Sequence, residues 1–356
     1  MTSVDIIIPV LDEEAFIQVC LQSVLAFQKE AGTAAKIFVM DGGSCDRTKD
    51  IALQMAEQYP EIQVLDNLGR IQSSALNTAI RLGAGDYVLR LDAHAQYPHD
   101  YLARCLAVSR ETGADSVGGV VVTRPGGSGF QAKVVQALST HWFGVGNSSF
   151  RLNAKPGLAD TVPFGFFRRS IFQEIGLFDE RLVRAQDYEF NRRIIASGGK
   201  VWLDPGIRAE YFNLPDLWSF YIKQLRKEGC YNAYLWYLAP YAFALRHGIT
   251  GAFAAGVMGG CLGSLLTPFI LWPFAVIMGL YFVLACFASV QQACRYRSAV
   301  LALALPPCFF LFHFLHGLGV LSGLLKLCIG AAPVQKAREP WPGANRFRAW
   351  PLSAAA

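Results

Sequence analysis

The sequence predicts an α/β protein with a doubly wound, mostly parallel sheet, followed by a C-terminal part made of membrane helices. Strand-like apolar runs alternate with amphipathic helical segments in the first part of the chain. Charged residues then become rare, and no Lys, Arg, Asp or Glu lies between Arg246 and Arg295. The 356 residues, 53% of them hydrophobic, therefore divide into a water-soluble domain and a membrane-associated one.

The alternation of elements justifies the parallel sheet. Consecutive apolar runs predict strands, and a repeat of three to four residues predicts the helices between them. After residue 113 the pattern becomes mixed, with another strand, a Gly-rich turn and a helix. In such a sheet, ligands bind at the carboxyl ends of the strands. The predicted strands are 4–10, 36–40, 63–66, 87–92 and 116–122, and the predicted helices are 14–29, 46–59, 72–82 and 130–138.

The C-terminal half contains three apolar segments, at about 249–267, 270–290 and 299–325. The first two predict a membrane hairpin, each long enough to cross a core of about 30 Å. A third crossing would place the basic tail, 331–356, outside, against the usual preference for basic residues in the cytoplasm. The third segment therefore either crosses as well, or lies in the interface or re-enters the membrane. We divide the chain into a soluble domain (1–230), an aromatic interfacial segment (231–248) and a membrane part (249–330). A helix packed on the soluble domain is the alternative for the aromatic segment.

Composition excludes several classes. A net charge of +5 with scattered basic residues gives no basis for nucleic-acid binding, but it suits an anionic lipid surface. The nine Cys residues form no metal-finger spacing. The first residues, MTSVDIIIPVLDEE, lack the basic region of a signal peptide, so we expect the soluble domain in the cytoplasm and the helices in the inner (plasma) membrane.

The stretch YVLRLDAH, residues 87–94, predicts a metal site. Asp92 and His94 follow a buried strand two positions apart, a spacing that puts side chains on one face of a strand. A carboxylate with an imidazole suits Mn²⁺ or Mg²⁺, and a diphosphate would fill the open positions. Acidic residues are common at strand ends, so the pattern is weak by itself.

Two other predicted strands end in polar residues. Pro9 lies next to the end of the first strand, and Glu13 follows where it can face the ligand. Asp41 ends the second strand before Gly42 and Gly43, and glycines let a backbone approach a ligand closely. All of these residues are therefore expected at one edge of the sheet.

Four motifs in this order, PVLDEE, DGGSCDRT, DAH and QDYEFNRR, resemble the family 2 glycosyltransferases, whose soluble domain has the GT-A fold. The resemblance covers roughly residues 4–230. The DAH triplet, in place of the more usual DxD, is similar to the ExoA-type subgroup of exopolysaccharide glucosyltransferases that make succinoglycan.

The resemblance implies a role for each matching residue. Glu13 and Asp41 match contacts to uracil and ribose, and Asp92 with His94 matches the metal and diphosphate site. Arg70 faces the phosphates or is a plain surface residue. Asp187 matches the catalytic base, although an Asp at a helix start is often only an N-cap. The sequence departs from the family at Gln186, where Glu is usual. Gln224 begins QLRK, a faint echo of the QxxRW of processive enzymes, which favours transfer of a single sugar. Further substrate-side positions from the motifs are Pro9 and Gly43.

The implied function is that of a membrane-anchored, inverting, metal-dependent enzyme of polysaccharide biosynthesis. It would move a sugar, glucose by resemblance, from a UDP-sugar to a polyprenyl-diphosphate-linked saccharide. Two alternatives are a non-catalytic membrane scaffold that binds a nucleotide sugar and a dinucleotide-dependent oxidoreductase. The oxidoreductase requires GxGxxG after the first strand, and residues 9–14, PVLDEE, contain no glycine.

Overall fold

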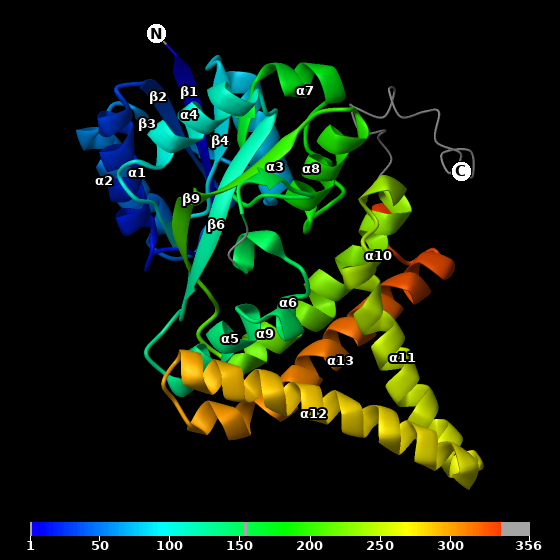
Figure 1. Cartoon of the computed structure of the whole chain (residues 1–356). Helices are drawn as coiled ribbons and strands as arrows, with labels where there is room; N and C mark the ends of the chain where they lie inside the picture. Colours follow the sequence, from blue (N-terminus) through cyan, green and yellow to red (C-terminus); the bar gives the residue numbers. More distant parts are fainter. Residues whose placement is uncertain (1, 153–154, 336–356) are drawn as a thin grey trace. The chain divides into compact units, whose positions relative to one another are not determined.

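A computed structural model describes residues 2–152 and 155–335 and confirms the α/β class, with a nine-stranded mixed sheet (Figure 1). The sheet order is β3-β2-β1-β4-β8-β6-β9-β5, and β7 pairs with β9 off this path. The predicted strands and helices of the first part all exist, with shifted ends. For example, the helix predicted over 14–29 is Ile17–Ala31.

One half of the sheet is parallel. β1, β2, β3 and β4 pair in parallel and are linked by helices. Since such crossovers are right-handed, α3 lies on the face opposite α1 and α2, because it returns across β2 and β1 to reach β4. The bounds are β1 (Ser3–Val10), α1 (Ile17–Ala31), β2 (Ala34–Asp41), α2 (Thr48–Gln58), β3 (Ile62–Asp66), α3 (Gln72–Leu82) and β4 (Tyr87–Arg90).

The other half contains antiparallel pairs. β8 runs antiparallel to both β4 and β6, and β9 runs antiparallel to β5 and β7. Helix α8 follows β8 in the chain and carries the QDYEFNRR motif. The bounds are β5 (Ala95–Gln96), α4 (Tyr101–Thr112), β6 (Ser116–Arg124), β7 (Gly157–Leu158), β8 (Phe166–Arg168), α7 (Ser170–Ile175), α8 (Gln186–Ala196) and β9 (Val201–Phe212).

The described residues form two compact units. The first holds residues 2–122 and 155–211 and contains the sheet, and the second holds 123–152 and 212–335 and is helical. The helical elements are α5 (Phe130–Ser139), α6 (Trp142–Val145), η1 (Ser149–Arg151), α9 (Leu217–Lys223), the π-helix η2 (Gln224–Glu228), α10 (Gly229–Leu238), η3 (Pro240–Ala242), α11 (Leu245–Leu266), η4 (Pro268–Ile270), α12 (Leu271–Arg295), α13 (Val300–Cys328) and η5 (Pro333–Gln335).

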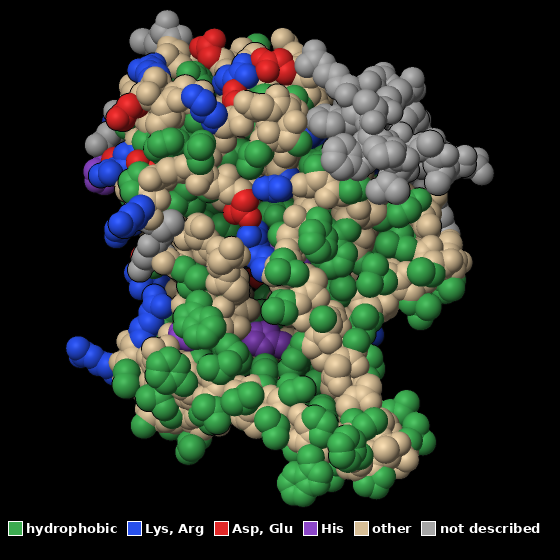
Figure 2. All heavy atoms as spheres, turned by 45° about the vertical axis from the view of Figure 1, so that its right-hand side comes forward, with side chains coloured by type: hydrophobic (Ala, Val, Ile, Leu, Met, Phe, Trp, Pro, Cys, Tyr) green, Lys and Arg blue, Asp and Glu red, His purple; other side chains and the backbone are tan. Residues whose placement is uncertain are grey.

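Within residues 2–152 and 155–335, three helices are long and apolar enough to cross a membrane: α11, α12 and α13. Helix α13 remains helical through Pro306 and Pro307, so the third apolar segment is one long helix. Large hydrophobic side chains are exposed along α11 and α12, and they cover much of the visible face of these helices (Figure 2). The basic residues of the tail from Lys336 onward lie outside the described residues.

Glycines allow α13 to pack tightly inside the helical unit. A Cβ at Gly317 would collide with the Thr250 carbonyl of α11, and one at Gly319 would collide with the Leu225 carbonyl of η2. Gly323 likewise faces the backbone of Cys230 in α10. Small residues let membrane helices approach this closely, which maximises van der Waals contact. Helix α13 is therefore the element around which α10 and α11 pack.

The aromatic residues of the predicted interfacial segment and of the residues just before it, from 216 to 241, have no single environment. Tyr221 and Tyr234 are buried, and Tyr221 packs in a core with Phe309 and Phe312 of α13. Trp218 is 74% exposed and Tyr237 49% exposed. Helical packing thus accounts for part of this segment, and only the exposed aromatics remain available for a membrane interface.

Candidate active site

Two aspartates share the guanidinium group of Arg90. Arg90 is the last residue of β4, and its Nη2 lies 2.7 Å from Oδ1 of Asp92. Its Nη1 lies 3.9 Å from Oδ2 of Asp187. Only 7% of the Arg90 side chain is exposed, so this cation is screened from water. The fold thus brings together two carboxylates that are far apart in the sequence.

Asp187 lies in the first turn of α8 and is its second residue, so it is not the N-cap that a helix-start Asp often is. The N-cap residue is Ala185, and Asp187 Oδ1 accepts a hydrogen bond from Tyr188 N at 2.8 Å. The side chain is 38% exposed. A carboxylate held at one side and open at the other can reach a hydroxyl group of a bound substrate.

His94 is held by two partners on its two ring nitrogens. Nδ1 lies 2.7 Å from Oε1 of Glu13, and Nε2 lies 3.1 Å from the Tyr211 hydroxyl. Residues 92–94 leave β4, which ends at Arg90, so the strand spacing used above does not apply to them. His94 therefore faces Glu13, and Asp92 faces Arg90.

Asp41 is turned toward its own backbone. It is only 2% exposed, and its carboxylate accepts from Gly43 N, Ser44 N and Ser44 Oγ. Gly43 has φ of 84°, a left-handed conformation that glycine adopts without strain. In this geometry Asp41 shapes the turn after β2.

Arg70 is exposed and borders that turn. Its Nε donates to Gly42 O at 3.0 Å and its Nη2 to Gly43 O at 3.3 Å. Pro9 lies within β1, paired in register with Met40. The residues matched to nucleotide contacts thus lie at the carboxyl ends of β1 and β2, as the sheet topology predicts.

Strained backbone marks this edge of the first unit. Positive φ costs a non-glycine residue roughly 1–3 kcal/mol and is concentrated at functional sites. Asp12 precedes Glu13, Ala185 precedes Gln186, and the ring of Phe164 lies 5.7 Å from the Arg90 guanidinium. The φ values are 55° for Asp12, 56° for Arg70, 50° for Phe164 and 61° for Ala185.

Several residues that complete the cluster are absent from the sequence-based prediction. Gln72 Nε2 donates to Asp92 Oδ1 at 3.0 Å, and Gln186 Nε2 donates to Gln72 Oε1. The Tyr97 hydroxyl donates to the Asp92 carbonyl at 3.0 Å. Gln186 is marked in the sequence only as a departure from the family motif, and Arg90 is marked as a charged residue inside an otherwise apolar strand.

The charges in the cluster stabilise one another. Burial alone would raise the pKa of the Asp92 carboxyl, but the nearby cations Arg90 and His94 hold that pKa below its usual range. Burial would lower the pKa of His94, but Tyr211, Glu13 and Asp92 raise it to about 10. In this arrangement Asp92 is an anion and His94 a cation at neutral pH.

The residues can hold a metal ion only loosely. No group of three or more His, Cys, Asp or Glu side chains is arranged around a metal position within residues 2–152 and 155–335. The protein would contribute Asp92 and His94, and His94 must first lose a proton, since imidazole binds metal in its neutral form. Two such ligands do not form a closed metal centre, so an ion here would need further ligands from a bound substrate.

Two residues noted in the sequence lie elsewhere or have structural partners. Gln224 is buried in η2 of the helical unit. Arg193, a basic residue of QDYEFNRR, is fully buried and pairs with Glu189 one turn earlier, while its Nη1 donates to Leu177 O at 2.7 Å. Arg193 therefore stabilises the interior of the first unit.

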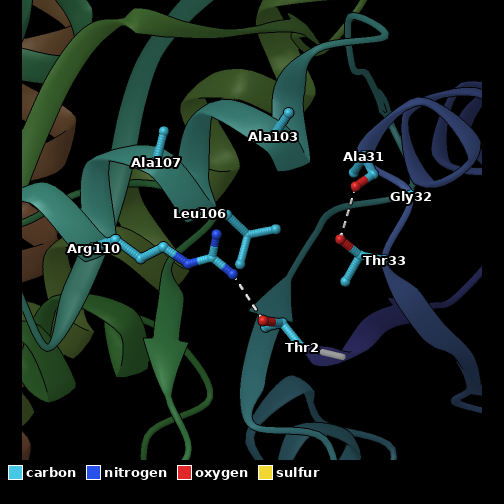
Figure 3. A pocket seen from close by; sticks show the side chains of 8 residues that line it. All are labelled: Thr2, Ala31, Gly32, Thr33, Ala103, Leu106, Ala107 and Arg110. Atoms are coloured by element: carbon cyan, nitrogen blue, oxygen red, sulfur yellow. Dashed lines mark hydrogen bonds between the residues drawn. The ribbon is translucent and has the colours of Figure 1, made fainter.

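A cavity of about 330 Å³ lies at the other end of the sheet (Figure 3). Thr2, which accepts a hydrogen bond from Arg110, precedes the first residue of β1, and Gly32 follows α1. The eight residues of β1 separate this cavity from Glu13 by roughly 25 Å of strand. The cavity is therefore distinct from the charged cluster.

Comparison with known proteins finds relatives along most of the chain. A sequence model of the family described as Glycosyl transferase family 2 matches residues 5–176. Succinoglycan biosynthesis protein ExoA of Rhizobium meliloti is 33% identical over 226 residues, which cover 62% of this chain and 67% of ExoA. A dolichyl N-acetyl-alpha-D-glucosaminyl phosphate 3-beta-D-2,3-diacetamido-2,3-dideoxy-beta-D-glucuronosyltransferase of Methanococcus voltae is 27% identical over 338 residues, 92% of this chain and 98% of the relative.

The fold has a counterpart among solved structures. The mannosyltransferase PcManGT of Pyrobaculum calidifontis, solved in complex with GDP-Man and Mn²⁺, aligns with a TM-score of 0.55 at 18% identity. The alignment covers 90% of this chain and 86% of that protein. At this identity the likeness concerns the fold, and the charged cluster described above lies at the edge of the sheet where such folds bind ligands.

Proposed function

This chain belongs to glycosyl transferase family 2, and we propose that it transfers one sugar from a UDP-sugar to a lipid-linked saccharide, with inversion at the anomeric carbon. The single observation that carries the proposal is the pairing of Asp92 and Asp187 with one guanidinium, that of Arg90. A carboxylate that binds the sugar donor and a general base must lie close together if both act in the same transfer reaction.

Asp187 acts as the general base. Its exposed carboxylate takes the proton of the acceptor hydroxyl while the oxygen attacks the anomeric carbon. The bond from that carbon to the diphosphate oxygen breaks, and the electron pair leaves with the nucleoside diphosphate. One displacement opposite the leaving group inverts the anomeric centre, so an α-linked donor gives a β-linked product. Arg90 orients the base from its buried side.

Asp92 and His94 bind the diphosphate side of the donor. They would hold Mn²⁺ or Mg²⁺ together with the phosphates, and such an ion would neutralise charge on the leaving group. PcManGT, which has the same fold, was solved with Mn²⁺, which supports this cofactor class. Glu13 orients His94 through Nδ1, and Glu13, Asp41, Gly43, Arg70 and Pro9 border the place proposed for the nucleotide.

The proposed acceptor is inferred from the relatives, and the proposed membrane anchor is inferred from the apolar helices. The Methanococcus voltae relative is named for a dolichyl-linked N-acetylglucosaminyl phosphate, and another relative is named as an undecaprenyl-phosphate transferase. We infer that α11, α12 and α13 anchor this enzyme in the inner (plasma) membrane, with the catalytic unit on the cytoplasmic side. A polyprenyl-diphosphate-linked saccharide would then present its sugar to Asp187. Glucose is the sugar we propose, from the resemblance to ExoA.

The test is a transfer assay with the full chain in lipid nanodiscs. UDP release and the mass of the glycolipid are measured with UDP-glucose, with other UDP-sugars and with GDP-mannose. Asp187→Asn should lower turnover by about 10²–10⁴-fold, the usual worth of a general base, while UDP affinity stays nearly unchanged. Asp50→Asn is the matched control, because Asp50 is also an exposed Asp in the first turn of a helix. A parallel collapse of UDP affinity would refute the base role, and release of GDP alone would refute the UDP donor.

A further inference from the structure

Helix α3 is tied to the segment that leads into α8. Asn77 Nδ2 donates to Phe178 O at 2.9 Å, and Ser73 Oγ donates to Leu182 O at 3.0 Å. A third hydrogen bond joins the side chains of Gln72 and Gln186, and Gln186 immediately precedes Asp187 in the sequence. These attachments along α3 thus fix the start of α8 in the first unit.

Asp92 determines the direction of the hydrogen bond between Gln72 and Gln186. The ion pair with Arg90 at 2.7 Å makes Asp92 an acceptor of hydrogen bonds, so Gln72 must present its N–H to Asp92. The atom of Gln72 that faces Gln186 is then its carbonyl oxygen, Oε1. Gln186 must therefore donate, which a glutamine amide does and an ionised glutamate does not.

The surroundings of Gln186 also oppose a carboxylate. Gln186 is 3% exposed, and its Oε1 is buried with no hydrogen-bond partner among residues 2–152 and 155–335. A second carboxylate oxygen at that place would be buried without a donor, which is strongly unfavourable. The glutamine at position 186, where the resembling family usually has Glu, is therefore matched to Gln72.

We propose that Gln186 is a positioning residue that, through Gln72, holds Asp92 in place relative to Asp187. The chain of contacts runs from Gln186 to Gln72 to Asp92, and Asp187 follows Gln186 directly in α8. Asp92, on the side of the sugar donor, and Asp187, the proposed base, are thus linked by uncharged amides. No further negative charge enters a cluster that already holds both aspartates. This inference rests on the proposed function of Asp92 and Asp187.

The test exchanges hydrogen-bond donors and acceptors among Gln186, Gln72 and Asp92. Gln186→Glu should lower turnover and UDP affinity in Mn²⁺ by about tenfold, the effect of one misdirected hydrogen bond to a charged group. Gln72→Lys in that background supplies a donor to both Asp92 and the new carboxylate, so the double variant should recover most of the loss. Gln72→Lys alone should be worse than wild type, because the introduced ammonium group adds a positive charge beside Arg90 that the Gln186 amide cannot neutralise. Gln58→Glu, on the exposed end of α2, controls for the added charge.

A second variant covers the case in which Gln186→Glu does not fold. Gln186→Met is buried without charge and should keep the melting temperature of the wild type, yet raise KM for the donor severalfold. Activity within twofold of wild type for both variants, or a double variant no better than Gln186→Glu, overturns the inference. The UDP titration distinguishes failure of this inference from failure of the proposed function. If the wild-type protein binds UDP but transfers no sugar, the proposed function is wrong. If the Gln186→Glu variant binds UDP with wild-type affinity, the positioning role is wrong.

Discussion

Polar side chains gather in two regions that differ in charge and in pairing. In the first unit, Arg90, Asp92 and Asp187 form a charged cluster with one exposed carboxylate. In the helical unit, His316 of α13 accepts from Asn232 of α10 at 3.1 Å and donates to Thr250 of α11 at 2.8 Å. His313 of the same helix is 2.8 Å from the hydroxyl of Tyr281 in α12.

The difference separates two uses of polar groups. Uncharged groups that are paired across helices hold those helices together, at a modest gain for each hydrogen bond. Charged groups that share a cation, with one face open, are costly to keep buried and are retained where chemistry requires them. We therefore expect substitutions in the first region to affect substrate binding as well as stability, and substitutions in the second region to affect stability alone.

Removal of Asp92 should have the largest effect on stability. Asp92→Ala leaves the buried Arg90 guanidinium with the longer contact to Asp187 as its ion pair, and loss of one partner of a buried ion pair costs about 3–5 kcal/mol. Asp66→Ala is the control, because the Asp66–Lys49 pair is exposed to water and is expected to contribute far less to stability. Both are measured by the denaturation of the full chain in detergent. Equal costs would contradict the distinction between the two pairs.

The same variant tests the metal site. UDP affinity of Asp92→Ala, measured by calorimetry, should fall mainly in the presence of Mn²⁺, because Asp92 is proposed to share the ion with the diphosphate. The same loss of affinity in a chelator would count against a metal role for Asp92 and would leave only its contact with Arg90.

Overpacking of α13 should have the next largest effect. Gly319→Leu places a side chain against the backbone of η2 and should lower the free energy of unfolding by about 1–3 kcal/mol. Gly256→Leu, in the interior of α11 with open space around it, should be neutral. Thermal unfolding and the yield of folded protein in detergent measure both. If the two variants behave alike, α13 does not pack through its glycines.

The smallest effect is expected at His316. His316→Leu removes two interhelical hydrogen bonds, each worth roughly 0.6 kcal/mol in a membrane protein, without touching the charged cluster. The melting temperature should fall by a few degrees, and turnover per folded molecule should stay at the wild-type level. A double-mutant cycle with Thr250→Val isolates the shared bond. A selective loss of turnover would give His316 a role in the reaction and remove the contrast between the regions.

Much of the fold could be predicted from the sequence, but less of the candidate site could be. Strand ends and family motifs mark Asp92, His94 and Asp187 in the sequence, and the structure brings Asp92 and Asp187 to one guanidinium. The roles of Gln72 and Gln186 are not recognisable, because a glutamine has no local pattern that reveals a partner more than a hundred residues away. Asp41 shows the opposite case, since its motif suggests a ligand contact and its carboxylate is occupied by its own turn.

The sequence by itself determined the alternation of strands and helices up to residue 92 and the presence of three apolar segments, because hydrophobic periodicity and composition act over neighbouring residues. Tertiary structure decided which carboxylates share Arg90, which ring nitrogen of His94 faces Glu13, and which aromatics of residues 216–241 are buried. These outcomes depend on how distant segments pack, and packing assigns each charged or aromatic side chain its partners only after the backbone has folded.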